Sequence, residues 1–149
     1  MSIEEYKPEY FESIERIYDL AKPDEFSFEE GDFSCLPLKK DSSALLLFEK
    51  SRIFVFKQEG ILGFSGYSDL TINWLFVDPV HRRKKVARAL LEHILSSVEG
   101  NLCLNVASSN VAAKNLYIDL GFSVIKTFIG NFSGKPISVD RMELVRGHS

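Results

Sequence analysis

Five basic side chains gather where a strand-like run gives way to a helix-like segment: Arg82, Arg83, Lys84, Lys85 and Arg88. Pro79–Lys85 contains no Ser, Thr, Asp or Asn that could cap the following helix, so the first backbone N–H groups of that helix are free for an outside partner. Unpaired N–H groups, the helix dipole and adjacent Arg and Lys side chains all favour an anion. The pattern therefore predicts a phosphate or pyrophosphate site at the start of this helix.

A second set of residues with chemical potential lies further along the chain. Asn110, Ala113 and Tyr117 are spaced by three and four residues, so they share one face of a predicted helix. Ser109 or Asn110 is a candidate N-cap of that helix, and Gly121 suits the left-handed residue that ends it. A Tyr in this setting either packs in the core or donates a proton, and the spacing alone leaves both interpretations open.

Hydrophobic periodicity predicts the elements that must hold these residues. Strand-like runs are Ile3–Tyr6, Arg52–Gln58, Ile61–Ser68, Leu70–Val77, Leu102–Val106, Phe122–Gly130 and Ile137–Val145. Helical spacing covers Glu9–Ala21, Ser42–Lys50, Val86–Val98 and Val111–Leu120. Glu59-Gly60 is a hairpin signal, and Asn131–Pro136 is expected to be a turn-rich connection. By itself, this order indicates a mixed α/β or α+β domain.

Composition limits the class of protein. The 149 residues are 45% hydrophobic and 26% charged, which predicts one globular domain over residues 1–149 with a real core. Eighteen basic and twenty-one acidic residues give a net charge of −3, so the basic cluster is local and nothing general attracts nucleic acid or a membrane. Without an apolar leader, a membrane-spanning run or a cysteine framework (Cys35 and Cys103 stand apart), we expect a cytoplasmic protein. We expect no metal.

Two segments carry a family resemblance. Val77-Asp-Pro-Val-His-Arg-Arg-Lys-Lys-Val-Ala resembles the acetyl-CoA loop of the GCN5-related N-acetyltransferases, the GNAT superfamily, which reads V-x-P-x-(Y/H)-(R/Q)-x-x-G-x-(G/A) between its fourth strand and third helix. Arg82 matches the Arg/Gln position and Ala87 the last Gly/Ala, whereas Lys85 stands where the family usually has its first Gly. The segment 110–122 is similar to the second family signature, N-x-x-A-x-x-x-Y-x-x-x-G-F, at every lettered position.

The resemblance covers about residues 3–145 and implies a mixed α/β GNAT fold of about seven strands and four helices. It implies an N-acetyltransferase, an acyltransferase that moves groups other than aminoacyl groups, with acetyl-CoA as co-substrate. The acceptor would be a primary amine of a small molecule or a protein, attacking directly. Tyr117 would be the catalytic acid that protonates the departing CoA thiolate. Cofactor contacts are implied for Leu75, Phe76, Val77, Arg82, Arg83, Lys84, Lys85, Val86, Ala87, Arg88, Asn110, Ala113 and Tyr117.

The resemblance also bears on how the reaction would be activated. The strand that ends at Val77 would splay from its neighbour, leaving N–H groups near Phe76 and Val77 to polarise the acetyl carbonyl. An alkylamine is mostly protonated at neutral pH, so a base must remove a proton. Many relatives place a Glu for this purpose where the chain has Asn105. The substitutes that remain are a water relay, Glu25, Glu29, Glu30, Asp69 and His81.

Several alternatives stay open. The segment Asp24–Cys35 carries five carboxylates and three Phe residues, so it is either an acidic, aromatic wall that suits a cationic amine or a solvated acidic loop. Lys85 and Asn105 suggest a GNAT-like module that binds acyl-CoA without catalysis. A nucleic-acid-binding domain using Arg82–Arg88 is disfavoured because the patch is short and lacks interleaved aromatic residues. A homodimer is also left open.

Overall fold

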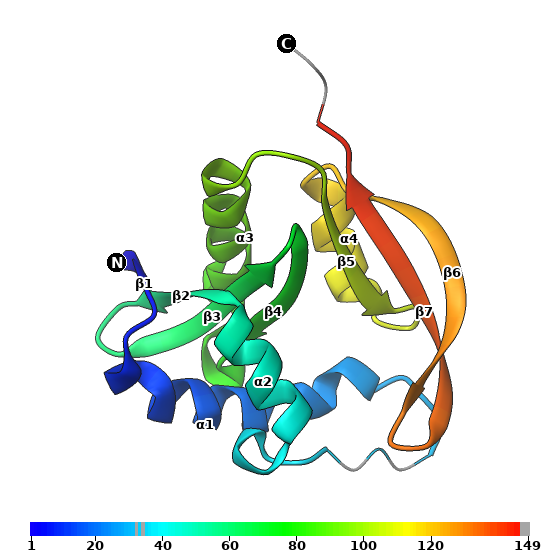
Figure 1. Cartoon of the computed structure of the whole chain (residues 1–149), viewed down its shortest axis with the longest axis horizontal. Helices are drawn as coiled ribbons and strands as arrows, with labels where there is room; N and C mark the ends of the chain where they lie inside the picture. The colour runs from blue at the N-terminus through cyan, green and yellow to red at the C-terminus, as the bar shows by residue number, and fades with distance from the viewer. Residues whose placement is uncertain (32, 34, 147–149) are drawn as a thin grey trace.

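A computed structural model describes residues 1–31, 33 and 35–146, with the side chains of Arg83 and Lys84 outside the description. Within this part of the chain, seven strands form one sheet and four α-helices pack against it (Figure 1). The strands are β1 (Ser2–Glu5), β2 (Arg52–Lys57), β3 (Ile61–Ser68), β4 (Thr71–Val77), β5 (Leu102–Ala107), β6 (Ser123–Phe132) and β7 (Lys135–Leu144). The helices are α1 (Phe11–Ala21), α2 (Ser42–Lys50), α3 (Val86–Ser97) and α4 (Val111–Asp119).

Four short 3-10 segments connect these elements: η1 (Pro8–Tyr10), η2 (Lys22–Phe26), η3 (Leu38–Lys40) and η4 (Pro79–Lys84). The helix expected to begin at Glu9 is thus a 3-10 turn followed by α1, and it does stop at Lys22, where the chain tightens into η2. The other three predicted helices are confirmed within two residues at each end. No described helix is long and apolar enough to cross a bilayer.

The sheet separates two layers of helices. Because side chains alternate along a strand, Ile53 and Val55 of β2 pack toward α1 and α2, whereas Phe54 and Phe56 pack on the opposite face. The first face is filled by aromatic rings around Trp74, and α3 and α4 cover the second. Helices thus cover both faces of the central strands, whereas the edge strand β6 stays largely exposed.

The sheet order is β1-β2-β3-β4-β5-β7-β6, and neighbouring strands are antiparallel except for β4 and β5. These two parallel strands pair only through Thr71 with Cys103 and Ile72 with Leu104. Beyond those pairs β4 continues to Val77 and β5 to Ala107, so the two strands diverge like the arms of a V (Figure 1). The sheet is therefore open in its middle at the carboxyl ends of both strands.

The last hairpin differs from the sequence-based expectation. A turn-rich connection was predicted over Asn131–Pro136, but β6 and β7 continue through it and Asn131 pairs with Pro136. Only Ser133 and Gly134 form the turn, both with positive φ, which suits a two-residue hairpin. Pro136 is tolerated inside a strand because β7 pairs with β5 only from Val139 onward, so the side facing β5 is free of a ladder at this level.

Candidate functional site

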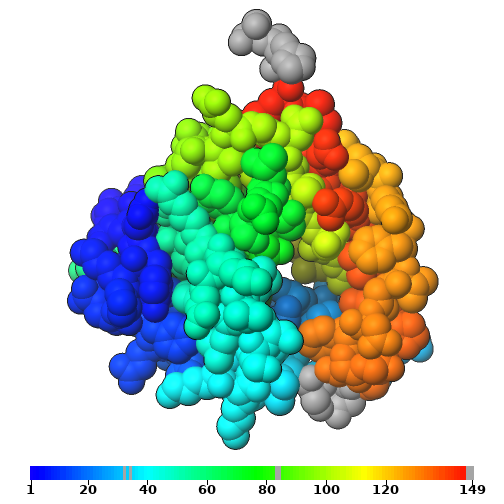
Figure 2. All heavy atoms as spheres, in the orientation of Figure 1, coloured from blue at the N-terminus to red at the C-terminus, as the bar shows by residue number. Residues whose placement is uncertain are grey.

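A cleft of about 800 Å³ occupies the opening between β4 and β5. Leu75–Val77 line one side of it and Asn105–Ala107 the other. Figure 2 shows the molecule hollowed at this place, between the blue segment after α1, the yellow-green β5 and the orange β6–β7 hairpin. The opening of the sheet is thus a real void that side chains do not fill.

The cleft reaches both faces of the sheet. On one face it is lined by Ala87 at the start of α3 and by Tyr117 of α4. On the other it is lined by Lys22 and Phe26 of η2 and by Phe132 from the end of β6. Two different molecules could therefore enter from opposite faces and meet between the strands.

Backbone N–H groups of β4 point into this gap. The N–H of Asp78 donates to the carbonyl of Leu62 on β3 at 2.8 Å. Since hydrogen bonding alternates along an antiparallel strand, the N–H of Phe76 also faces β3, and those of Leu75 and Val77 face the gap. The expectation for Val77 therefore agrees with this geometry, but Leu75 rather than Phe76 supplies the second open N–H.

The loop between β4 and α3 is held by Asp78. Its carboxylate accepts a hydrogen bond from the Val80 N–H at 3.0 Å and pairs with the Arg16 guanidinium at 2.9 Å. Burial of Asp78 raises its pKa, but these two interactions outweigh burial, so the pKa lies below the ordinary value. The charged carboxylate thereby fixes η4 at the end of β4.

Helix α3 begins without a side-chain cap, as predicted. Lys85 precedes it with φ of +58°, in the left-handed region, and its side chain makes no capping hydrogen bond. Val86, Ala87 and Arg88 follow as the first turn, whose N–H groups have no partner within a helix. The predicted anion site thus has the backbone geometry that it requires, and Lys85 occupies a conformation that favours Gly.

The basic side chains around this turn do not all converge. Arg82 lines the cleft and pairs with Asp24 of η2. Arg88 instead reaches α4 and pairs with Asp119. Lys85 is exposed, and the side chains of Arg83 and Lys84 lie outside the described residues. Carboxylates therefore hold Arg82 and Arg88 in this structure, and a bound phosphate would have to compete with them.

Helix α4 presents Asn110, Ala113 and Tyr117 to the cleft. Asn110 is the N-cap, and its side-chain oxygen accepts from the Ala113 N–H at 3.4 Å, so the side-chain amide N–H₂ group does not take part in the cap. Tyr117 is 9% exposed. Burial, with a contribution from the charge of Glu25, raises the pKa of the Tyr117 phenol well above its ordinary value. The phenol therefore remains protonated at neutral pH.

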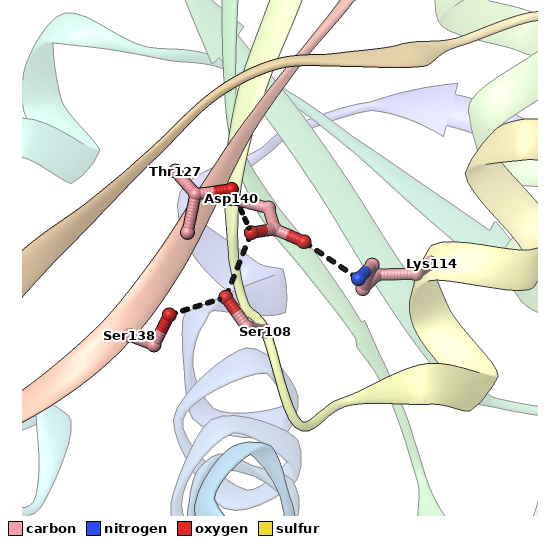
Figure 3. A network of polar contacts seen from close by, with 5 residues as sticks. All are labelled: Ser108, Lys114, Thr127, Ser138 and Asp140. Atoms are coloured by element: carbon pink, nitrogen blue, oxygen red, sulfur yellow. Dashed lines mark hydrogen bonds and ion pairs between the residues drawn. The ribbon is translucent and has the colours of Figure 1, made fainter.

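The start of α4 is braced by a buried polar network (Figure 3). Asp140 of β7 accepts hydrogen bonds from Ser108 at 2.7 Å and Thr127 at 2.8 Å, and pairs with Lys114 of α4 at 2.6 Å. Ser108 also contacts the Ser138 hydroxyl at 2.8 Å. This network joins β6, β7 and α4 to the loop after β5, so it fixes the loop that carries Asn110.

The candidate bases are scattered. Glu25 lines the cleft and pairs with Lys22 at 2.8 Å. Glu29 accepts from the Ser109 hydroxyl, and Asp69 lies in the β3–β4 turn, at the opposite end of β4 from Val77. Glu30 is exposed, and His81 belongs to η4.

Asn105 lines the cleft, and its side-chain oxygen accepts a hydrogen bond from Arg141 at 3.4 Å. Among the carboxylates Glu25, Glu29, Glu30 and Asp69, Glu25 is therefore the best placed to act as a base in the cleft.

Sequence reasoning missed Lys22. In the sequence Lys22 only follows the helix predicted over Glu9–Ala21. In the structure the Lys22 ammonium lies in the cleft, close to the rings of Tyr18, Phe26, Phe76 and Phe132. The signal within the segment was the run of Phe residues after Lys22, but Phe76 and Phe132 come from distant strands. Of the acidic segment, Asp24, Glu25 and Glu29 are all paired inside the protein, while Asp32 is outside the described residues.

Comparison with known sequences gives one family. The family model of the acetyltransferase (GNAT) domain matches residues 49–124. The ribosomal protein bS18-alanine N-acetyltransferase of Escherichia coli strain K12 is 41% identical over 59 residues, covering 37% of this chain and 40% of that protein. The Shigella flexneri protein of the same name gives the same figures. The chain thus matches only two fifths of the length of these curated relatives.

Solved structures share the fold over nearly the whole chain. The YncA protein of Salmonella typhimurium, solved with its cofactor acetyl-CoA, has a TM-score of 0.77 at 18% identity, covering 100% of this chain and 96% of that one. The ribosomal-protein-S18-alanine N-acetyltransferase of Escherichia coli has a TM-score of 0.75 at 22% identity, covering 99% and 95%. At these identities the likeness establishes the fold.

Proposed function

Because the chain belongs to the acetyltransferase (GNAT) domain family, we propose that residues 1–149 form one acetyl-CoA-dependent N-acetyltransferase domain. The acetyl group would pass to a primary amine of a small molecule or a protein. The observation that carries the proposal is the continuous cleft that crosses the sheet between β4 and β5, with Tyr117 on one face and Glu25 on the other.

Acetyl-CoA would enter from the face covered by α3 and α4. Its pyrophosphate would take hydrogen bonds from the open N–H groups of Val86, Ala87 and Arg88, because the uncapped end of α3 favours an anion. Arg82 would exchange Asp24 for a phosphate oxygen. The Asn110 amide would contact the pantetheine arm along α4. The small side chain of Ala113 would leave room for that arm.

The thioester would then lie between the strands. The N–H groups of Leu75 and Val77 face this space and would polarise the acetyl carbonyl, stabilising the oxyanion as the amine attacks. Tyr117 would donate its proton toward the CoA sulfur as the carbon–sulfur bond breaks. The phenol holds its proton at neutral pH and so has one to give, while burial, which raises its pKa, makes it a weaker acid than an exposed Tyr.

The amine would enter from the opposite face, past η2. An acceptor ammonium has to lose a proton before it can attack, and Glu25 is the carboxylate that we propose as its base. Asp24 also lines the cleft, but its carboxylate pairs with Arg82 of the loop after β4, so we do not assign it as the base. The Asn105 side-chain amide is not basic enough to accept this proton, so we assign Asn105 only to the wall of the cleft.

The name of the Escherichia coli relative favours a protein amino group among the acceptors. The proposal is tested by measuring CoA release from acetyl-CoA with a panel of acceptors: peptides with a free alanine amino group, polyamines and small alkylamines. We expect release that depends on one class of amine and yields its acetylated form. Tight acetyl-CoA binding in calorimetry with no release by any amine would favour the non-catalytic binding module instead. Absence of acetyl-CoA binding would reject both.

A further inference from the structure

Lys22 brings a primary amine of the chain itself into the cleft. Its side chain is only 19% exposed, and its ammonium pairs with Glu25 at 2.8 Å. The ammonium also lies 5.6 Å from the ring centroid of Phe132 and 5.8 Å from those of Phe26 and Phe76. This is a small cage of aromatic faces with one carboxylate, a combination that stabilises a cation out of water.

The position of this cage within the cleft matters more than its chemistry. Phe76 is the residue of β4 between Leu75 and Val77, whose N–H groups face the gap between the strands. Lys22 contacts the Phe76 ring from the α1 face, which is the face proposed for the acceptor amine. The Lys22 ammonium therefore occupies the side of the cleft from which an amine would approach the thioester.

Resting on the proposed function, we propose that Lys22 is a self-acetylation site. When no other amine fills the acceptor side, the ε-amino group of Lys22 accepts the acetyl group of acetyl-CoA bound in the same molecule. A Lys side chain has a flexible stem of four carbons, so rotation about its bonds can move the nitrogen from the cage toward the gap while the backbone of η2 stays in place.

The reaction needs no further reagent. Glu25 takes one proton from the ammonium, and the neutral amine attacks the thioester carbonyl so that a carbon–nitrogen bond forms. The tetrahedral intermediate collapses, the carbon–sulfur bond breaks, and the sulfur leaves with a proton from Tyr117, while the second proton of the nitrogen passes through solvent to the Tyr117 phenolate and restores the phenol. The products are acetyl-lysine, CoA thiol and one proton, which solvent takes up from Glu25.

Acetylation would change the acceptor side of the cleft. The amide is uncharged, so it loses both the ion pair with Glu25 and the attraction to the aromatic rings. The acetyl group also adds bulk where an external amine would bind. We therefore expect the acetylated protein to turn over external amines several-fold more slowly than the unmodified protein.

The test is mass spectrometry of the intact protein and of its peptides after incubation with acetyl-CoA alone. We expect one acetyl group, on Lys22, added at a rate that is independent of protein concentration because the transfer is intramolecular. Lys22→Arg should abolish it while keeping a positive charge beside Glu25. Lys39→Arg is the matched control, since Lys39 also faces a carboxylate, Glu15 at 3.7 Å, but its side chain is 70% exposed.

Tyr117→Phe provides a second readout. Enzymatic acetylation of Lys22 should slow in this variant, whereas chemical acetylation of exposed lysines by acetyl-CoA should not. Acetyl groups spread over the exposed lysines, at the same rate in Tyr117→Phe, would overturn the self-acetylation. An unmodified Lys22 in a protein that acetylates external amines would also overturn it and leave the proposed function intact. Modified Lys22 without any accepted external amine would support self-acetylation and reject the proposed acceptors.

Discussion

The backbone carbonyl of Tyr117 accepts a hydrogen bond from the Phe122 N–H at 2.9 Å, and the two rings meet edge to face with centroids 6.0 Å apart. Between them Gly121, with φ of +105°, donates its N–H to Ile118 at 3.0 Å. This pair of hydrogen bonds is a Schellman motif, which closes α4. The spacing Y-x-x-x-G-F thus has a structural reason: the residues that end the helix also hold Tyr117 in the cleft.

Replacing Gly121 with Ala should weaken this support. An Ala would be strained at the positive φ, and its Cβ would lie 2.9 Å from Leu144 Cδ1. We expect the free energy of unfolding to fall by about 1–3 kcal/mol in urea denaturation, together with a loss of turnover. Gly60→Ala is the control, since its φ of +114° is equally unfavourable but no atom lies within 4 Å. Equal costs in both variants would show that the contact with Leu144 contributes nothing.

Much of this arrangement could be predicted from the sequence because it is local. Helical spacing gives the face shared by Asn110, Ala113 and Tyr117, and Gly121 marks its end. The lack of a capping side chain before Val86 is likewise read directly from residue types. Each of these features depends on contacts within one turn or one helix, where residue type and spacing determine the geometry.

The features that were missed depend on contacts between distant segments. Lys22 lies in the cleft because rings from β4 and β6 meet there, and no pattern within η2 specifies which strands are its neighbours. The same holds for Asp140, which accepts hydrogen bonds from Thr127 of β6 and from Ser108 in the loop after β5. The pairing of Arg88 with Asp119 is also a tertiary contact. Because the sequence does not show this partner, the positive charge of Arg88 by itself indicates a phosphate ligand.

Lys85→Gly should relieve backbone strain. A non-glycine residue in the left-handed region costs about 1–2 kcal/mol, which the extra freedom of Gly in the unfolded chain offsets in part. We expect unfolding free energy unchanged or raised by up to about 1 kcal/mol, and acetyl-CoA affinity lowered by about two- to fivefold at low salt through the lost charge. Lys85→Ala removes the same charge but keeps the strained backbone. We therefore expect Lys85→Gly to be the more stable of these two variants. Complete loss of acetyl-CoA binding in Lys85→Gly would reveal an indispensable contact of the lysine.

The Asp140 network predicts a pH dependence of stability. The ammonium of Lys114 lowers the Asp140 pKa, burial opposes it, and the Ser108 and Thr127 hydroxyls lower it further, so the net shift is downward. A carboxyl whose pKa is lower in the folded state stabilises the fold above its unfolded pKa of about 3.9, and this contribution disappears as the pH falls through the folded pKa. We therefore expect the wild type to lose stability below about pH 4.

Asp140→Asn should remove this contribution. At neutral pH we expect a loss of about 2–3 kcal/mol, since Lys114 loses its partner, and a flatter acid limb in thermal unfolding. Glu5→Gln is a suitable control because its ion pair with Arg52 is exposed. An acid limb unchanged in Asp140→Asn would mean that other carboxylates, such as Asp78, govern acid unfolding.

Arg82 and Arg88 should differ in their effect on cofactor binding. Arg82 lines the cleft, whereas Arg88 is turned toward Asp119. We expect Arg82→Ala to weaken acetyl-CoA binding by about tenfold and Arg88→Ala by less, with both effects reduced by salt. Arg52→Ala, at the first residue of β2 and outside the lining of the cleft, serves as the control for loss of one exposed arginine. Calorimetry in which Arg82→Ala binds like the wild type would remove this residue from the phosphate site.

The central claim concerns the departure of the CoA sulfur beside Tyr117. Tyr117→Phe keeps the ring that packs on Phe122 and removes only the proton donor, so unfolding and acetyl-CoA binding should change little. The decisive measurement is the steady-state rate of CoA release by this variant on an amine that the wild type accepts. We expect a decrease of about tenfold to a thousandfold, with the lower half favoured because a thiol leaves readily. A rate equal to that of the wild type would make Tyr117 a packing residue and contradict the account.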